Sequence, residues 1–578
     1  MHHAPRIRDL FDRAKTLVQN WRQFSLRKFF YLPSILSQKE KRVIGFFLGV
    51  CLVSGGFLLG RLYFSVTAPA PQRGGSYTEG VLGEPRTVNP LFASTDPERD
   101  LVRLVYAGLF TYSGSGSLEP DLAENIETSS DGKTYTITLK KNIQWHDGEP
   151  LTADDVLFTV RAIQNPQYKS LLRANWQGVS VERLNDLTLR FTLRAPYAPF
   201  LENLTVGILP KHLWERIRPE QAGLHELNQK PVGSGAYGVS SVKKDKNGSV
   251  LSYRLSAHKK YHREGPYLKT ITLVFFKTET DAIRALETGV IDGFGPLSSP
   301  QAMRARVLRP SSVHTILIPR IFTLFFNQQK SKTLADANIR EAITHAIDKR
   351  VLAATEAADG ATPIASPFPR VDGGPEKYPY DPERAKELLD AAGWRDANAD
   401  GIREKKNTPL RFILVTSDVE NLVVVSERIR EMLRAVGIDI VIDKRSFADL
   451  ELDVLKPRNF EMLLFGQVYG YEPDPFAFWH SSQAKDPGLN IISYSNKKVD
   501  RLLEEARRTS NTAERNARYG EAGKLIASDL PGVFLYSQLY RYLLPDHIKG
   551  VDLQTISLPS DRFNGINRWH IKTKRVLR

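Results

Sequence analysis

Two short motifs in this sequence use residue types that proteins employ to hold phosphates or metal ions. The first, GSGAYG at residues 233–238, has the glycine spacing that cradles a pyrophosphate when a strand precedes it and a helix follows. Here the next residues read VSSVKK and lead into a turn and a strand. The context therefore excludes a dinucleotide site.

The second motif, DANADG at residues 396–401, places oxygen-bearing side chains at alternate positions, as a calcium loop does. Its candidate ligands are Asp396, Asn398 and Asp400. The twelfth position is Asn407, where a calcium loop carries a bidentate glutamate. We therefore favour a tight turn whose side chains bind its own backbone, with a calcium site as the alternative.

The arrangement of nucleophile and base that hydrolases need is not visible in the sequence. His146 stands beside Asp147 in WHDG, but such a pair alone is more often part of a turn than of a catalytic triad. The single cysteine, Cys51, lies inside an apolar run, which excludes thiol catalysis further along the chain. These observations predict a binding protein that is not an enzyme and uses no cofactor.

A third cluster combines aromatic and acidic side chains. Residues 468–479 read VYGYEPDPFAFW and contain Tyr469, Tyr471, Glu472, Asp474 and Trp479. The rings can stack on a ligand or fill the edge of a lobe, and the acids can bind a cation or order a proline-rich turn. Both interpretations stay open at this point.

Strand and helix patterns alternate from about residue 74 onward, which favours α/β lobes with substantially parallel sheets. The predicted strands are 135–139, 187–193, 250–255, 410–416, 438–442 and 461–465. The predicted helices are 154–163, 281–287, 339–353, 382–392, 423–436, 498–508 and 513–528. A chain of 578 residues is longer than a single hydrophobic core can organise, so we expect two or more lobes.

The beginning of the chain carries a concentrated positive charge followed by an apolar run. Residues 1–42 contain ten Lys/Arg and three Asp/Glu, nearly half of the net charge of +15. Residues 43–60 are uncharged and as a helix would span roughly 27 Å, about the thickness of a hydrocarbon layer. The remaining charge is mixed in sign along the chain, so we expect no nucleic-acid partner.

This pattern predicts a single-pass protein of the plasma (inner) membrane. The positive-inside rule makes 1–42 a basic cytoplasmic tail and 43–64 a transmembrane anchor, with the main domain extracytoplasmic. Residues 65–75 read SVTAPAPQRGG and are predicted to be a flexible linker. A signal peptide cleaved near Ala68-Pro69-Ala70 is the alternative.

Ten ordered segments between about 74 and 545 resemble the extracellular solute-binding proteins of the peptide and nickel class, family five, which serve ABC importers. The densest block, 119–158, reads EPDLAENIETSSDGKTYTITLKKNIQWHDGEPLTADDVLF. Other matching segments are VYAGLF at 105–110, PVGSGAY at 231–237, YDPE at 380–383 and DLP at 529–531.

This resemblance implies a two-lobed periplasmic-binding-protein (Venus-flytrap) fold, preceded here by one transmembrane helix. Lobe I would comprise 74–110, 205–310 and 536–578, with an extra subdomain at 111–204, and lobe II would be 311–535. The implied function is capture of a peptide or similar small solute by lobe closure, and its delivery to ABC permease subunits. The alternative is a membrane-tethered sensory or interaction protein with the same fold.

The resemblance also selects candidate ligand-binding residues. They are Tyr106, Asn327, Tyr469, Tyr471, Glu472, Asp474, Trp479 and Asn490. Peptide binders of the family hold the ligand's α-amino group with an aspartate in a D-x-x-[D/E]-P segment. Tyr469 stands at that position, so either Glu472 or Asp474 would have to supply the acid, and the solute is not identified.

Overall fold

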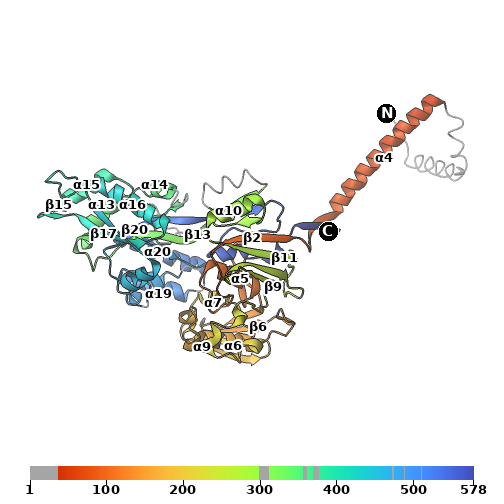
Figure 1. Ribbon diagram of the computed structural model, residues 1–578, viewed down its shortest axis with the longest axis horizontal. Coiled ribbons are helices and arrows are strands. Elements are labelled where there is room, and N and C mark those ends of the chain that lie inside the picture. Colours follow the sequence, from red (N-terminus) through yellow and green to blue (C-terminus); the bar gives the residue numbers. More distant parts are fainter. Residues whose placement is uncertain are drawn as a thin grey trace, which may run out of the picture. The chain divides into compact units, whose positions relative to one another are not determined.

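The computed structural model describes residues 37–297, 311–355, 361–368, 376–471, 474–486, 488–509 and 511–577. The chain divides into two compact units, Met1–Ala70 with Thr573–Arg578, and Pro71–Lys572. The larger unit contains the hydrophobic cores and most of the secondary structure (Figure 1).

An eleven-stranded sheet runs through the larger unit. In spatial order its strands are β18 (Asp439–Arg445), β17 (Arg411–Ser417), β19 (Met462–Val468), β13 (Ser311–Phe326), β20 (Gly532–Pro545), β12 (Gly293–Phe294), β2 (Ser76–Leu82), β11 (Thr270–Phe276), β10 (Val250–Ala257) and β9 (Tyr237–Lys244), while β14 (Thr362–Pro363) pairs with β20 off this path. Strand β17 is parallel to β18 and β19, and β2 is parallel to β11 and β12.

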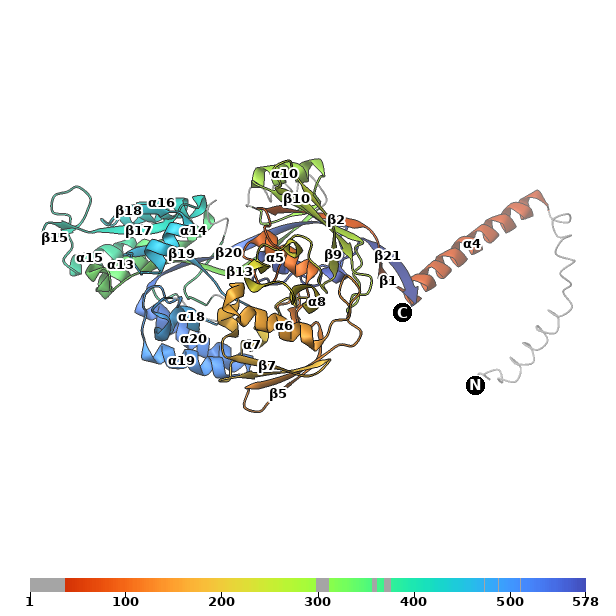
Figure 2. The ribbon, with the colours of Figure 1, turned by 60° about the horizontal axis from the view of Figure 1, so that its bottom comes forward.

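The expectation of mainly parallel sheets is therefore only half right. Strand β13 pairs antiparallel with both β19 and β20, so the sheet as a whole is mixed. The physical reason is connectivity, because the chain leaves the first half of the sheet along β13 and returns to it along β20 (Figures 1 and 2). Two strands that cross in opposite directions must pair antiparallel.

Among the described residues, β13 contributes buried side chains to three hydrophobic cores and β20 to four. Ile318 belongs to the core of the first half of the sheet, and Ile321 to a core of the second half. The ladder between β13 and β20 is interrupted between Leu317 and Ile321. There the Ser537 hydroxyl lies 3.0 Å from the carbonyl oxygen of Ile318 and 3.2 Å from that of Arg320. Regular pairing thus stops where one core ends and the other begins, and fewer ladder hydrogen bonds oppose bending there.

We use lobe I for the residues around the first core, which joins segments between Tyr77 and Phe275 to returning residues 540–569. A four-stranded sheet lies within it, in the order β5 (Ala123–Thr128), β6 (Thr134–Leu139), β8 (Thr188–Leu193) and β7 (Val179–Asn185). Burial alternates along β6 and β8, as predicted for half-buried strands. Helix α6 (Ala153–Gln164) covers this sheet, and α10 (Glu279–Thr288) packs near β2.

We use lobe II for the residues around the two cores that lie between Ile321 and Tyr536. Its longer helices are α13 (Ala337–Ala346), α14 (Lys349–Ala354), α15 (Pro382–Ala391), α16 (Glu420–Arg434), α19 (Lys497–Arg508) and α20 (Thr512–Asp529). The helix predicted over 339–353 is in fact two helices. Asp348 accepts hydrogen bonds from the amides of Arg350 and Val351 and so begins a new helix there.

In the described part of the smaller unit, helix α4 (Gln38–Val66) is long and apolar enough to cross a membrane. Residues 65–75 were expected to form a flexible linker, but most of them belong to regular secondary structure. Residues Thr67–Gln72 form β1, which pairs with β21 (Lys572–Leu577) in a two-stranded sheet. Pro69 and Pro71 are two positions apart, so both can face the unpaired side of the strand, where a missing N–H costs no ladder bond.

A buried ion cluster ties the returning C-terminal segment to the start of lobe I. The Arg562 guanidinium, fully buried, donates to Glu79 of β2 at 2.9 Å and to Asp100 of α5 (Asp96–Val105) at 2.8 Å. The hydroxyl of Tyr542 donates to the second oxygen of Glu79 at 2.7 Å. Burial raises the pKa of Asp100 to about 6, with Arg562 opposing that shift.

Replacing Arg562 by methionine should lower the free energy of unfolding by about 3–5 kcal/mol, because two buried carboxylates would lose their cation. Urea unfolding of the detergent-solubilised chain, followed by fluorescence, measures this loss. The matched control is Arg568→Met, since Arg568 is half exposed and lies 4.0 Å from Asp552. Its expected effect is below about 0.5 kcal/mol, and equal losses in the two variants would contradict the assigned role.

Candidate functional site

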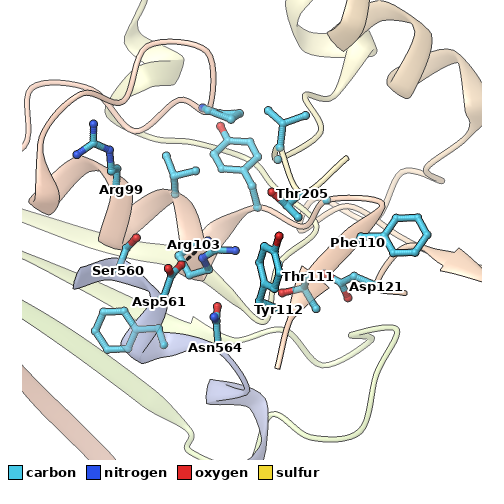
Figure 3. A pocket seen from close by; sticks show the side chains of 18 of the residues that line it. Arg99, Arg103, Phe110, Thr111, Tyr112, Asp121, Thr205, Ser560, Asp561 and Asn564 are labelled. Carbon is cyan, nitrogen blue, oxygen red and sulfur yellow. Dashed lines mark hydrogen bonds and ion pairs between the residues drawn. The ribbon is translucent and has the colours of Figure 1, made fainter. Parts of the chain in front are cut away.

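A cavity of about 370 Å³ lies where lobe I, the C-terminal segment and one loop of lobe II meet. Its walls come from α5, from β3 (Phe110–Tyr112), from residues 202–207, from residues 557–567 and from Gly470 and Tyr471. Figure 3 shows the polar side chains of α5, β3 and the C-terminal segment around this space. The volume is in the range of small-molecule binding pockets.

One face of helix α5 supplies the first wall. Arg99, Val102 and Arg103 line the cavity together with Tyr106, which caps the helix at its C-terminal end. These positions are spaced by three or four residues, so they project from the same side of the helix. Tyr106 was predicted as a ligand-binding residue because it lies in the family-like segment at 105–110. Arg99 and Arg103 were not predicted, but their helical spacing of three or four residues from Tyr106 and Val102 is the sequence feature that could have identified them.

An aromatic pair from the two lobes forms the opposite wall. The rings of Tyr112 in lobe I and Tyr471 in lobe II are stacked, with centroids 3.8 Å apart and planes at 22°. The Asn564 side chain donates to the Tyr471 hydroxyl at 3.1 Å, and Tyr112 donates to Glu202 at 2.6 Å. Tyr471 was predicted as a ligand-binding residue, whereas Tyr112 was not, because nothing local in its sequence marks it.

Among the described residues three acidic side chains line the cavity, and each has a close partner. Asp561 accepts from Arg103 at 2.8 Å, and Asp121 lies 2.7 Å from the Nε2 of His262. Glu202 is the acceptor of the Tyr112 hydroxyl. Figure 3 shows Arg103 and Asp561 turned toward one another.

The cavity cations Arg99 and Arg263 are less closely paired. Arg99 approaches Asp96 at 3.4 Å, and Arg263 approaches Glu119 at the same distance and Asp121 at 3.8 Å. The pairs with Asp96 and Glu119 are partly exposed, where water weakens the attraction. Of the described ionisable groups that line the cavity, these two guanidinium groups are the ones with the weaker pairing.

The glycine motif at 233–238 packs closely against the backbone at the C-terminal end of α5. A Cβ on Gly233 would lie 2.0 Å from the carbonyl oxygen of Val105, and one on Gly235 would lie 2.7 Å from the carbonyl oxygen of Leu104. The amide of Gly235 donates to the carbonyl of Val105 at 2.8 Å. Only glycine permits this approach, so the motif has a packing role, consistent with the rejection of a dinucleotide site.

His146 holds that glycine segment from the other side. Its Nδ1 accepts from the amide of Gly233 at 3.2 Å, and its Nε2 lies 3.0 Å from the carbonyl oxygen of Gly235, which assigns the proton to Nε2. Burial lowers the pKa of His146 to about 4, and the nearby ring of His258 adds to this effect. The WHDG segment is therefore a structural element that supports the cavity wall, as the turn interpretation anticipated.

Four of the predicted ligand-binding residues lie away from the cavity. Tyr469 and Trp479 are buried in a lobe II core, where the Trp479 Nε1 donates to the Tyr469 hydroxyl at 3.0 Å. Asn327 donates to the carbonyl of Arg458 at 2.8 Å, and Asn490 donates to that of Tyr494 at the same distance. In this structure the four side chains hold lobe II together.

Of the two acids predicted to bind the ligand, the structure describes only Asp474. Asp474 pairs with Arg507 of α19 at 2.9 Å and accepts from the hydroxyl of Tyr197 at 3.2 Å. Because Tyr197 belongs to lobe I, this contact joins the two lobes outside the cavity. Glu472 lies outside the described residues.

The DANADG segment forms the predicted turn. Asp396 accepts from the amide of Gly401 at 3.0 Å, Asn398 from that of Asp400 at 2.9 Å, and Asp400 from that of Ile402 at 2.7 Å. The oxygens are thus bound to the backbone of the turn, which is exposed. Among the described residues no group of three or more His, Cys, Asp or Glu is arranged to hold a metal ion.

Two lobes joined by crossing strands, with a cavity at their junction and an aromatic pair across it, define a binding protein that closes around a solute. The comparisons with known proteins agree. The model of the bacterial extracellular solute-binding proteins, family 5 Middle, matches residues 117–488. The chain belongs to this family.

The relatives include binding proteins for different solutes. The oligopeptide-binding protein AppA of Bacillus subtilis is 28% identical over 502 residues, covering 84% of this chain and 90% of the relative. The nickel-binding periplasmic protein of Escherichia coli is 30% identical over 415 residues, covering 68% of this chain and 74% of the relative. The solved structure of Bacillus subtilis AppA with a nonapeptide is 27% identical with a TM-score of 0.70, covering 87% of this chain and 100% of that one.

The two-lobed periplasmic-binding-protein fold is thereby established, and this family consists of binding proteins. Among the predicted site residues, the cavity brings together Tyr106 and Tyr471.

The neutral His146 makes the stability of lobe I depend on pH. Its pKa is lower in the folded chain, about 4, than in the unfolded chain, about 6.5, so the unfolded state binds more protons between these values. Stability should therefore fall as the pH is lowered from about 6.5 to 4, by on the order of 1–3 kcal/mol from this group. Chemical denaturation at a series of pH values measures the slope.

His146→Gln removes the titration and should flatten that slope, even though it lowers stability at neutral pH. His212→Gln is the control, because His212 is partly exposed and pairs with Asp147 on the surface. An unchanged slope in His146→Gln would contradict the assignment.

Proposed function

We propose that this chain captures a peptide or similar small solute by lobe closure and delivers it to the permease of an ABC importer. The observation that carries the proposal is the cavity, which Tyr471 of lobe II and Tyr112 of lobe I close together. The interruption between β13 and β20 supplies the hinge that such closure needs. Membership in the family, whose members named here bind oligopeptides or nickel, supports the same function.

The charges around the cavity favour one end of a peptide over the other. In the described part of the lining, the acids have partners at 2.6 to 2.8 Å, whereas Arg99 and Arg263 approach their nearest carboxylates at 3.4 Å. A free carboxylate, such as a peptide carries at its C-terminus, can accept charge-assisted hydrogen bonds from these guanidinium groups. Tyr469, at the position where peptide binders of the family carry an acid, is buried away from the cavity.

We further propose that the chain is anchored in the plasma membrane. Helix α4 spans the plasma membrane once, residues 1–42 remain in the cytoplasm, and the solute-binding lobes face outward. The one-sided basic charge before α4 and the length of its apolar run support this orientation. Permease subunits are then the partners on the outer face.

The chain acts on its solute without chemical change. Of the two acids that a hydrolase would have to use, Asp474 is bound to Arg507 and Tyr197. Mass spectrometry of solute recovered after prolonged incubation should return it intact. Cleaved solute, with cleavage abolished by Asp474→Asn or Glu472→Gln, would refute this part of the proposal.

Thermal unfolding with blocked peptides tests the solute class. Pools of tripeptides, free or N-acetylated, should stabilise the chain, whereas C-amidated pools should bind about tenfold to a hundredfold more weakly, because a charge-assisted hydrogen bond is lost. Binding that survives amidation but not acetylation would assign recognition to an acid, such as Glu472. No stabilisation by any pool would remove peptides as the solute.

The variant Arg99→Gln should weaken binding of free tripeptides about tenfold or more while leaving the free energy of unfolding nearly unchanged. Arg190→Gln is the matched control, since Arg190 is partly exposed on β8 and is not part of the cavity. Isothermal titration with the best-binding pool member gives both affinities. Equal affinities for the two variants would contradict a role for Arg99.

An uptake measurement distinguishes a role in transport from a role in sensing. Cells that lack this chain should lose uptake of the bound solute, measured with a radiolabelled form. Unchanged uptake, with a changed response to that solute, would favour the alternative of a membrane-tethered sensor.

A further inference from the structure

A short loop of lobe I reaches lobe II outside the cavity. It joins β8 to α7 (Phe200–Asn203) and carries Tyr197 and Ala198 between Pro196 and Pro199. Pro196 fixes its own φ, and Pro199 restricts Ala198 to extended conformations, so the loop loses little further freedom when it makes a contact. Helix α7 lies next to α19 of lobe II (Figure 2), and the Ala198 amide meets α19 near its C-terminal end.

The part of lobe II that this loop meets is an ion pair. The two oxygens of Asp474 accept from the Nε of Arg507 at 2.9 and 3.0 Å. The Arg507 guanidinium also lies 3.8 Å from the ring centroid of Phe476, which packs against a lobe II core. The charge-assisted bonds and the cation–π contact both hold Arg507 in place. Because all of these partners belong to lobe II, the pair needs no contact with lobe I to be ordered.

Two hydrogen bonds connect the lobes at this place. The Tyr197 hydroxyl donates to Asp474 at 3.2 Å, and the Ala198 amide donates to the carbonyl of Arg507 at 2.9 Å. The Tyr197 ring centroid also lies 5.2 Å from the Arg507 guanidinium. Burial and the charge of Asp474 raise the pKa of Tyr197, so its hydroxyl keeps the proton that it donates. The side chains of Asp474 and Arg507 are only 17% and 28% exposed, so little water competes for these bonds.

These contacts differ from the aromatic pair that also joins the lobes. Tyr112 and Tyr471 line the cavity, so a solute enclosed there can alter their stacking. Tyr197, Asp474 and Arg507 are not among the described residues that line the cavity. Their contribution to the free energy of closure is therefore independent of which solute the cavity holds.

We propose that Tyr197 and Ala198 of lobe I form a closing latch with Asp474 and Arg507 of lobe II, which slows release of the solute without touching it. This inference rests on the proposed lobe closure but not on the identity of the solute. The bonds between the lobes exist only in the closed form, so each of them shifts the population toward that form. Because a solute leaves through the open form, the latch lowers the rate of its dissociation.

Distances between two spin labels in the full, detergent-solubilised chain test this inference. The labels are attached at Thr192→Cys of β8 and Arg501→Cys of α19, both exposed positions, in a Cys51→Ser background. The variant Tyr197→Phe removes one hydrogen bond to a carboxylate, so the ratio of closed to open distances should fall about tenfold or more. The matched control is Tyr253→Phe, because the Tyr253 hydroxyl donates to the carbonyl of Gln229 at 2.9 Å inside lobe I. It should keep the ratio of the unsubstituted chain.

Titration with the tripeptide pools extends the same comparison to closure that a solute induces. The concentration that closes half of the molecules should rise about tenfold in Tyr197→Phe and stay unchanged in Tyr253→Phe. Equal behaviour of the two variants would overturn the latch and leave the proposed function intact. A latch effect seen without any response to tripeptides would support the latch and remove peptides as the solute. A single distance under all conditions would overturn lobe closure and the latch together.

Discussion

The buried Arg562 is the interaction on which the architecture of this chain depends. It joins a strand from the start of the large unit, a helix next to it and a segment from its end, through Glu79 and Asp100. Desolvating three charges is costly, and the arrangement is stable only because each charge is matched at short range. Removing one partner would leave the others buried without compensation, so the cluster specifies which segments meet.

The cavity follows from that junction. Asp561, next to Arg562, pairs with Arg103 on the same helix that carries Asp100. The residues that follow, up to Asn567, line the cavity, and Asn564 reaches the Tyr471 hydroxyl. A C-terminal segment fixed to α5 by two ion pairs thus presents its polar side chains to lobe II, and the aromatic stack completes the enclosure.

The irregular pairing between β13 and β20 is the place at which lobe closure would bend the molecule. Most of the sheet is regular, but the pairing of β13 with β20 is interrupted where the two sets of cores meet. Tyr471 and the Asp474–Arg507 pair lie beyond that interruption and contact lobe I at Tyr112 and Tyr197. Opening the hinge would break these contacts, so closure and the contacts that favour it are coupled through a single irregular segment.

Local chemistry in the sequence was enough to determine several features of this protein. The alternation along 135–139 and 187–193 predicted strands, the uncharged run at 43–60 predicted an apolar helix, and the ordered segments predicted the family and fold. These features depend on neighbours within a few residues or on ordered motifs.

The tertiary structure alone decided which side chains face the cavity. Tyr112 meets Tyr471 across 359 positions of chain, and Tyr469, two residues from Tyr471, turns into the core instead. The same holds for β1, where prolines suggested a flexible linker until a strand from the other end of the chain paired with it. Contacts between distant segments are set by packing and charge pairing in three dimensions, which periodicity along the chain does not record.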